Sequence, residues 1–238
     1  PFTAESGGQS PRFLAGRSLF HKDDTMTANI DLYFSFRSPY SYLATPGALQ
    51  LEQDFDVEVA LRPVLPLAVR MPEFFNPENM TKVQYILLDW ERRAEMLGLP
   101  HKWPSPDPIV QDFETWSIPQ EQPYIYRLCW LGVEAENRGH GIEFAAEVSR
   151  MIFGGTEGWD QGEHLAEASA RAGLNLADME AAIGDGSQHQ AVVEKNQEHQ
   201  AIAKHHGVPL FVYNDEPFFG QDRIDSLAWR LGKDGLKR

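Results

Sequence analysis

Sulfur is scarce in this chain, which holds a single cysteine, Cys129, among its 238 residues. One cysteine cannot form an intrachain disulfide, so the sequence excludes a disulfide-stabilised fold and favours a reducing compartment such as the cytoplasm. Cys129 stands in the apolar-rich stretch YRLCWLGV. A small residue in such a stretch is expected to be buried in the core.

Basic residues are also few, with 21 Lys and Arg against 35 Asp and Glu and a formal net charge of -14. This balance disfavours nucleic acid and anionic membrane surfaces as partners, and an anionic substrate would need a local basic patch. Residues 1–25 contain no apolar run long enough for a signal sequence or a membrane span. We interpret residues 1–28 as a flexible N-terminal extension.

Hydrophobic residues make up 42% and aromatic residues 11% of the chain, which is typical of a globular protein. The β-branched and aromatic run at 30–36 and the alternating run at 57–61 predict two strands. Between them, Ser38 and Pro39 are suited to cap and begin a helix over 39–54. A β-α-β unit with two parallel strands follows from this order.

The middle of the chain predicts helices and one proline-rich loop, at 103–123. Strands return near the end, as a hairpin over 209–219, and a closing helix follows over 223–231. The helices are expected at 78–97, 124–137, 142–153, 160–172, 176–183 and 188–205.

The order β-α-β, helices, β-β-α predicts an α/β protein of the thioredoxin-like fold with a large all-helical domain inserted in its middle. We assign residues 29–65 and 206–238 to the thioredoxin-like domain, and residues 66–205 to the helical insertion domain.

The predicted first turn carries Ser38 and Ser41 at the spacing of a C-x-x-C redox motif, with oxygen in place of both sulfurs. Two serines cannot exchange disulfides, so a thiol would have to come from a bound molecule. A helix N-terminus stabilises a thiolate, and the Ser38 hydroxyl could donate a hydrogen bond to it. Alternatively, Ser38 only caps the helix, and the two roles are compatible.

Several motifs occur together in one order along the chain. They are F-x-F-x-S-P-Y-S-Y-L-A at 34–44, Leu61-Arg62-Pro63, Lys82 with Tyr85 and Asp89, Gly98-Leu99-Pro100 before Trp103-Pro104, Gly207-Val208-Pro209, and Phe219-Gly220-Gln221-Asp222-Arg223. With these motifs, residues 29–232 resemble 2-hydroxychromene-2-carboxylate isomerases and kappa-class glutathione transferases, in the DsbA-like branch of the thioredoxin superfamily.

This resemblance implies a glutathione site. Pro209 would follow a cis peptide bond, and the backbone of Val208 would pair with the cysteinyl unit of the tripeptide. Asp222 would bind the γ-glutamyl ammonium, while Gln221 and the first N–H groups of the last helix would bind its carboxylate. Asp222 could instead be a helix-start residue without a ligand.

Two further residues of the resemblance are expected at the edge of the site. Lys82 would offer a charge to the glycyl carboxylate or to an anionic substrate, although a solvated lysine is the alternative. Tyr40 would line the pocket without transferring protons, and Arg223 would be structural.

The resemblance implies a glutathione-dependent cis-trans isomerase that acts on an aromatic unsaturated keto acid by reversible thiolate addition, in aromatic compound catabolism. The alternatives are a kappa-class transferase that conjugates glutathione to an electrophile, and a non-catalytic thioredoxin-like binding module. Relatives of the kappa class suggest a homodimer. We expect no metal site, because the histidines at 189, 199, 205 and 206 lack ligand spacing.

Overall fold

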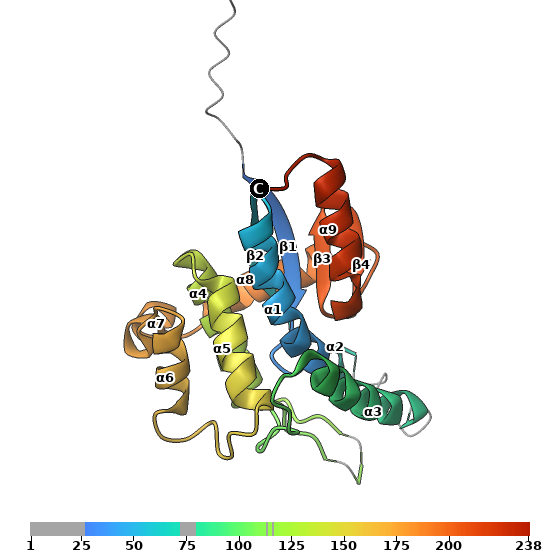
Figure 1. Cartoon of the computed structure of the whole chain (residues 1–238). Coiled ribbons are helices and arrows are strands. Elements are labelled where there is room, and N and C mark those ends of the chain that lie inside the picture. Colours follow the sequence, from blue (N-terminus) through green and yellow to red (C-terminus); the bar gives the residue numbers. More distant parts are fainter. Residues whose placement is uncertain (1–26, 72–79, 113, 116) are drawn as a thin grey trace, which may run out of the picture.

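A sheet of four strands, in the order β2-β1-β3-β4, forms the centre of the computed structural model (Figure 1). The structure describes residues 27–71, 80–112, 114–115 and 117–238. β1 is parallel to β2 and antiparallel to β3, which is antiparallel to β4. The strands are β1 (Ala28–Phe34), β2 (Val57–Pro63), β3 (Leu210–Tyr213) and β4 (Glu216–Phe219).

Helices cover both faces of the sheet and extend from one side of it. In Figure 1, α1 and α9 lie side by side in front of the sheet, and α8 lies behind it. The helices are α1 (Pro39–Asp54), α2 (Leu67–Arg70), α3 (Met80–Leu97), α4 (Ile125–Asn137), α5 (Gly141–Phe153), α6 (His164–Arg171), α7 (Leu176–Ile183), α8 (Ser187–Ile202) and α9 (Ile224–Lys233). The thioredoxin-like order with helices inserted between β2 and β3 is therefore confirmed.

Several predicted boundaries were wrong. β1 ends at Phe34 because the chain turns there, with the Ser38 N–H donating to the Ser35 carbonyl at 2.9 Å. The last long insertion helix, α8, ends at Ile202 because Lys204 takes a left-handed conformation with φ 59°. Residues 221–223 form a 3₁₀ turn, and α9 starts after them. The short α2 was not predicted, and residues 78–79 of the helix expected over 78–97 lie outside the described residues.

α1 contains Pro46 in its interior, a residue that normally ends a helix. Pro46 has no N–H to donate to the carbonyl of Tyr42, four residues earlier. The Thr45 hydroxyl donates to that carbonyl instead, at 2.9 Å. A side chain thus satisfies the group that proline leaves unpaired, and the helix continues to Asp54.

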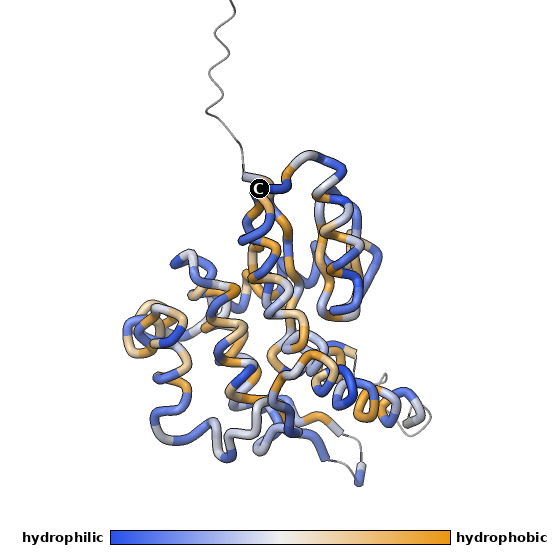
Figure 2. Tube along the Cα trace, viewed as in Figure 1, coloured by the Kyte–Doolittle hydropathy of each residue, from blue (hydrophilic) through white to orange (hydrophobic). Residues whose placement is uncertain are grey.

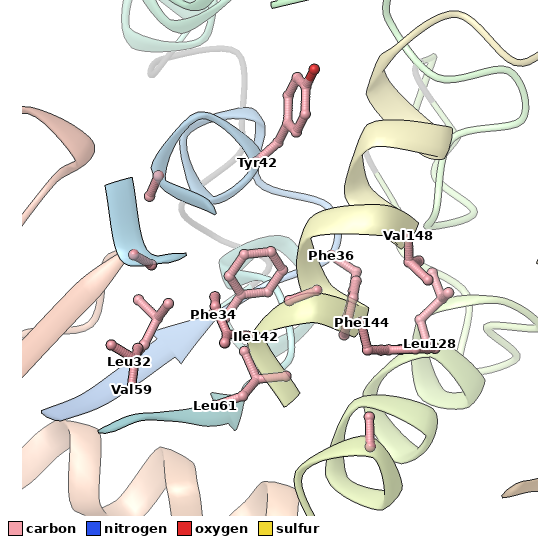
Figure 3. Packing of buried hydrophobic residues seen from close by; sticks show 14 of the residues in the cluster. Leu32, Phe34, Phe36, Tyr42, Val59, Leu61, Leu128, Ile142, Phe144 and Val148 are labelled. Atoms are coloured by element: carbon pink, nitrogen blue, oxygen red, sulfur yellow. The ribbon is translucent and has the colours of Figure 1, made fainter. Parts of the chain in front are cut away.

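One hydrophobic cluster extends from the sheet into the inserted helices. Phe36, fully buried in the turn after β1, packs edge-to-face against Phe34 and against Phe144 of α5, with ring centroids 5.1 and 6.0 Å apart (Figure 3). Orange and blue alternate along α5 in Figure 2, as expected for a helix with one buried face. The division into 29–65 with 206–238 and 66–205 stays a prediction, since the core crosses it.

Cys129 is fully buried in α4, as predicted. Burial raises the pKa of its thiol to about 12, so the thiol is protonated at neutral pH and is not a nucleophile. In the described part of the chain, no helix is both long and apolar enough to cross a membrane.

Candidate functional site

Four loops meet at one edge of the sheet. β1 and β2 are parallel and end at this edge, β3 begins there, and β4 ends there. The loops that follow or precede them are therefore neighbours in space although they are far apart in sequence. They are residues 35–38, 64–66 with α2, 204–209 and 220–223. Ser38, Val208, Pro209, Gln221 and Asp222 are all in these loops, as the resemblance required.

Ser38 caps α1. Its Oγ accepts a hydrogen bond from the Ser41 N–H at 3.2 Å, so the hydroxyl proton remains available for donation to a ligand. Pro39 has no N–H, and no described residue accepts a hydrogen bond from the N–H of Tyr40. Ser38 is half-buried, whereas Ser41 is fully buried. The positive end of α1 and one hydroxyl group can therefore face an anion at this position.

Tyr40 connects the start of α1 to α3. Its hydroxyl donates to Asp89 Oδ2 at 2.7 Å, and Asp89 also accepts from Arg92. Burial, together with the hydrogen bond to Asp89, raises the pKa of Tyr40, so the phenol stays protonated at neutral pH. Tyr40 is thus a hydrogen-bond donor to Asp89, and its role in lining the pocket stays a prediction.

Asp89 gives this connection a pH dependence. Burial alone would raise its pKa, but the hydrogen bonds from Tyr40 and Arg92 outweigh burial and hold the pKa below the ordinary value of 3.8. A carboxylate with a lowered folded-state pKa stabilises the fold above its unfolded pKa, and this stabilisation is lost as the pH falls through the folded value.

We therefore expect Asp89→Asn to lower the free energy of unfolding by about 1 kcal/mol at pH 7, and by progressively less below pH 4. Thermal unfolding followed by circular dichroism between pH 3 and pH 8 would measure this. Asp215→Asn, in an exposed turn, makes the same change in net charge and is the control. A constant difference between wild type and Asp89→Asn down to pH 3 would contradict the assignment.

The peptide bond between Val208 and Pro209 is cis, as the resemblance implied. Within the described ranges, no hydrogen bond reaches the backbone N–H or carbonyl of Val208. The Pro209 carbonyl accepts from the Gly220 N–H at 2.9 Å, which fixes the end of β4 beside the start of β3. The unpaired groups of Val208 are suited to pair with an extended peptide.

Gly220 lets the chain turn tightly after β4. Its φ is 105°, and a Cβ there would lie 2.5 Å from Asp222 Oδ1. The Asp222 carboxylate pairs with Arg223 at 2.9 Å, and both side chains are exposed. The structural role of Arg223 stays a prediction. The N–H groups expected from the last helix belong instead to the 3₁₀ turn over 221–223.

Gln221 is tied to α3, because its Oε1 accepts from Arg93 at 2.8 Å. This bond leaves the amide NH₂ of Gln221 available as a donor. Lys82 is exposed on α3, seven residues before Asp89, which places it about 10 Å along the helix on the same face. The structure thus places Lys82 on the helix that borders the site, two turns from the contact with Tyr40.

A segment of the proline-rich loop borders the other side of the turn. Arg37, next to Ser38, donates from Nε and Nη2 to the two carboxylate oxygens of Asp107 at 2.9 and 3.1 Å. The guanidinium lies 5.9 Å from the ring centre of Trp103. The indole of Trp159 donates to the Pro106 carbonyl at 2.7 Å. These contacts hold residues 103–107 beside the turn that carries Ser38, so a molecule bound near Ser38 would meet them.

Sequence reasoning missed three polar residues of this edge: Arg70, Arg93 and Gln200. Gln200 is fully buried, and it links Arg70 to the carbonyl of Gly207. No spacing rule brings these positions to Val208 or Gln221, because the contacts join residues far apart in the chain.

A cavity of about 470 Å³ lies elsewhere, between α5, α6 and the turn after α5. Its lining includes Pro100, Glu147, Arg150, His164 and Arg171, and none of the four loops contributes to it. The cavity is therefore separate from the candidate site around Ser38. Among the described side chains, no group of three or more His, Cys, Asp and Glu residues could hold a metal ion.

A family model described as the DSBA-like thioredoxin domain matches residues 29–232. The 2-hydroxychromene-2-carboxylate isomerase of Pseudomonas putida is 24% identical over 215 residues, which are 86% of this chain and 94% of that protein. The enzyme of the same name from Sphingobium xenophagum is 26% identical over 211 residues, 85% of this chain and 97% of that protein.

Solved structures agree on the fold. A 2-hydroxychromene-2-carboxylate isomerase matches with a TM-score of 0.65 and 20% identity, over 86% of this chain and 95% of the other. The cytosolic disulfide reductase DsbM from Pseudomonas aeruginosa, solved with GSH, matches with a TM-score of 0.52 and 15% identity, over 85% and 98% of the two chains.

Proposed function

The chain belongs to the DSBA-like thioredoxin family, and from this premise we propose that it is a glutathione-dependent isomerase of an aromatic unsaturated keto acid. One observation carries the proposal: the hydroxyl of half-buried Ser38 caps α1 as an acceptor only, at the same end of the sheet as the unpaired backbone of Val208, in a turn that has no cysteine. A thiol supplied by a ligand would complete this arrangement. The similarity to curated isomerases supports the same class of reaction.

In the proposed reaction, the thiolate of glutathione adds to a conjugated carbon of the substrate. The electron pair of the double bond moves onto the carbonyl oxygen, and the former double bond becomes a single bond that can rotate. After rotation the electron pair returns, the carbon–sulfur bond breaks and the thiolate leaves. Atoms and electrons balance without an oxidant, and glutathione is regenerated.

The chain's own residues hold the reactants in this scheme. Ser38 donates a hydrogen bond to the thiolate, and the start of α1 stabilises its charge. The cysteinyl unit pairs with the backbone of Val208 beside Pro209. At the γ-glutamyl end, Asp222 binds the ammonium and Gln221 donates to the carboxylate. Lys82 supplies positive charge for a carboxylate of glutathione or of the substrate.

The fold is compatible with this ligand, since DsbM, a protein of the same fold, was solved with GSH. A kappa-class transferase would use the same thiolate but release the conjugate. Isomerisation without net consumption of glutathione would support the isomerase, whereas net conjugation of an electrophile would support the transferase. A non-catalytic binding module would show no affinity for glutathione.

We expect Asp222→Asn to weaken glutathione binding about tenfold, because the ammonium loses its charged partner. Its effect on stability should be small, since the pair with Arg223 is exposed. Isothermal titration calorimetry measures the Kd. Asp225→Asn, exposed in the first turn of α9, makes the same charge change as a control. If wild type does not bind glutathione at millimolar concentrations, the proposed function fails.

A further inference from the structure

Arg70 is a cation that pairs with no carboxylate of the described residues. Its Nη1 donates to Gln200 Oε1 and its Nη2 to the His206 carbonyl, both at 3.0 Å, and its Nε is buried without a hydrogen bond. Among the described residues, no carboxylate pairs with it. Burial lowers its pKa to about 10, so it remains charged at neutral pH. A partly buried cation of this kind is normally paired.

The fold places this guanidinium at the proposed glutathione site. α2 follows β2 and so lies at the edge where Ser38 stands. Gln200 accepts from Arg70 and donates to the Gly207 carbonyl at 2.8 Å, while Arg70 itself reaches the carbonyl of His206. Arg70 therefore lies beside the two residues that precede Val208.

The direction of the bound peptide follows from the order of the loops. The γ-glutamyl end is proposed at Gln221 and Asp222, which adjoin Pro209 through the hydrogen bond from Gly220. An extended peptide that pairs antiparallel with Val208 then runs from the Pro209 side toward the Gly207 side. Its C-terminal glycyl carboxylate consequently reaches residues 206–207, where the Arg70 guanidinium is located.

We propose that Arg70 binds the glycyl carboxylate of glutathione. This inference rests on the proposed function and deepens it, because it leaves Lys82 of α3 to a carboxylate of the second substrate. In a chain with a formal charge of -14, a guanidinium without an acid favours an anionic ligand at this position. Arg70 also positions the loop before Pro209, so its two roles need separate measurements.

The test compares two ligands that differ only in the glycyl group: glutathione and its glycyl monoethyl ester, which is uncharged there. Calorimetry should show wild type binding glutathione about tenfold more tightly than the ester. In Arg70→Met this ratio should fall to about one, and Arg70→Lys should recover part of it. Gln200→Met disturbs the same loop without removing charge and should weaken both ligands alike.

If Arg70→Met still binds glutathione about tenfold more tightly than the ester, the inference is overturned. It is also overturned if this preference is lost in Lys82→Met and kept in Arg70→Met. Thermal unfolding confirms that each variant is folded. If Arg70→Met does not fold, the ratio of the two affinities is measured in Arg70→Lys instead. Wild type that binds both ligands equally also refutes the role of Arg70, while leaving the glutathione function intact. Wild type that binds neither ligand refutes the proposed function itself.

Discussion

Replacing Ser38 with alanine should lower kcat/KM for the isomerisation by about 10- to 100-fold. A hydrogen bond to a charged group contributes about 1.5 to 3 kcal/mol, and tenfold in rate corresponds to about 1.4 kcal/mol. The Ser38 oxygen accepts the cap hydrogen bond, and no group among the described residues accepts the hydroxyl proton. The pKa of the thiol of bound glutathione should rise in the variant, which ultraviolet absorbance of the thiolate during a pH titration would detect.

Capping and thiolate binding can be separated at this position. Alanine at an N-cap costs about 1 kcal/mol of stability, whereas glycine costs only a few tenths. Ser38→Gly should therefore lose activity like Ser38→Ala while it unfolds at nearly the wild-type temperature. Ser41→Ala removes the neighbouring buried hydroxyl and should leave the thiol pKa unchanged. Full activity in Ser38→Gly would disprove the proposed role of Ser38.

Phe36→Ala should lower the free energy of unfolding by about 3 to 5 kcal/mol, the usual cost of removing a buried phenylalanine. Phe36 is fully buried, and its ring contacts Phe34 of the sheet and Phe144 of α5 (Figure 3). A Cβ at Gly132 of α4 would lie 2.9 Å from the same ring. The cavity would thus open between the sheet and the inserted helices.

Denaturant titration followed by circular dichroism and tryptophan fluorescence measures this loss. Trp229→Ala is the control: its side chain is 58% exposed, and its removal should cost less than about 1 kcal/mol. Because one core joins the sheet to α4 and α5, both probes should report a single transition. Two separate transitions in wild type would show that the predicted domains unfold independently.

Local rules predicted the parts of this molecule that local interactions determine. The cap at Ser38 and the proline at the first position of α1 follow from neighbouring residues, and so does the strand predicted over 57–61, which the structure extends to Pro63. The cis bond before Pro209 came from the family resemblance and not from a local rule. The helix predicted over 39–54 is confirmed although it contains Pro46, because the Thr45 hydroxyl satisfies the freed carbonyl.

The contacts that complete the candidate site join distant segments. Arg70 meets His206 across 136 positions, and Arg93 meets Gln221 across 128. No periodicity or spacing encodes such pairs, so the sequence does not distinguish these two arginines from other charged residues. The end of α8 was missed for a related reason: it depends on the left-handed conformation of Lys204, which residue type alone did not predict.

The two serines at positions 38 and 41 affect how this turn would respond to oxidants. A cysteine at position 38 could form a mixed disulfide with oxidised glutathione, and position 41, with 0% of its surface exposed, would have to supply the second sulfur to release it. The present chain has no thiol in this turn, and Cys129 is buried and protonated. In the proposed reaction, the reacting thiol belongs to glutathione, which exchanges with solution, so a sulfur oxidised at this turn would be replaced together with the ligand.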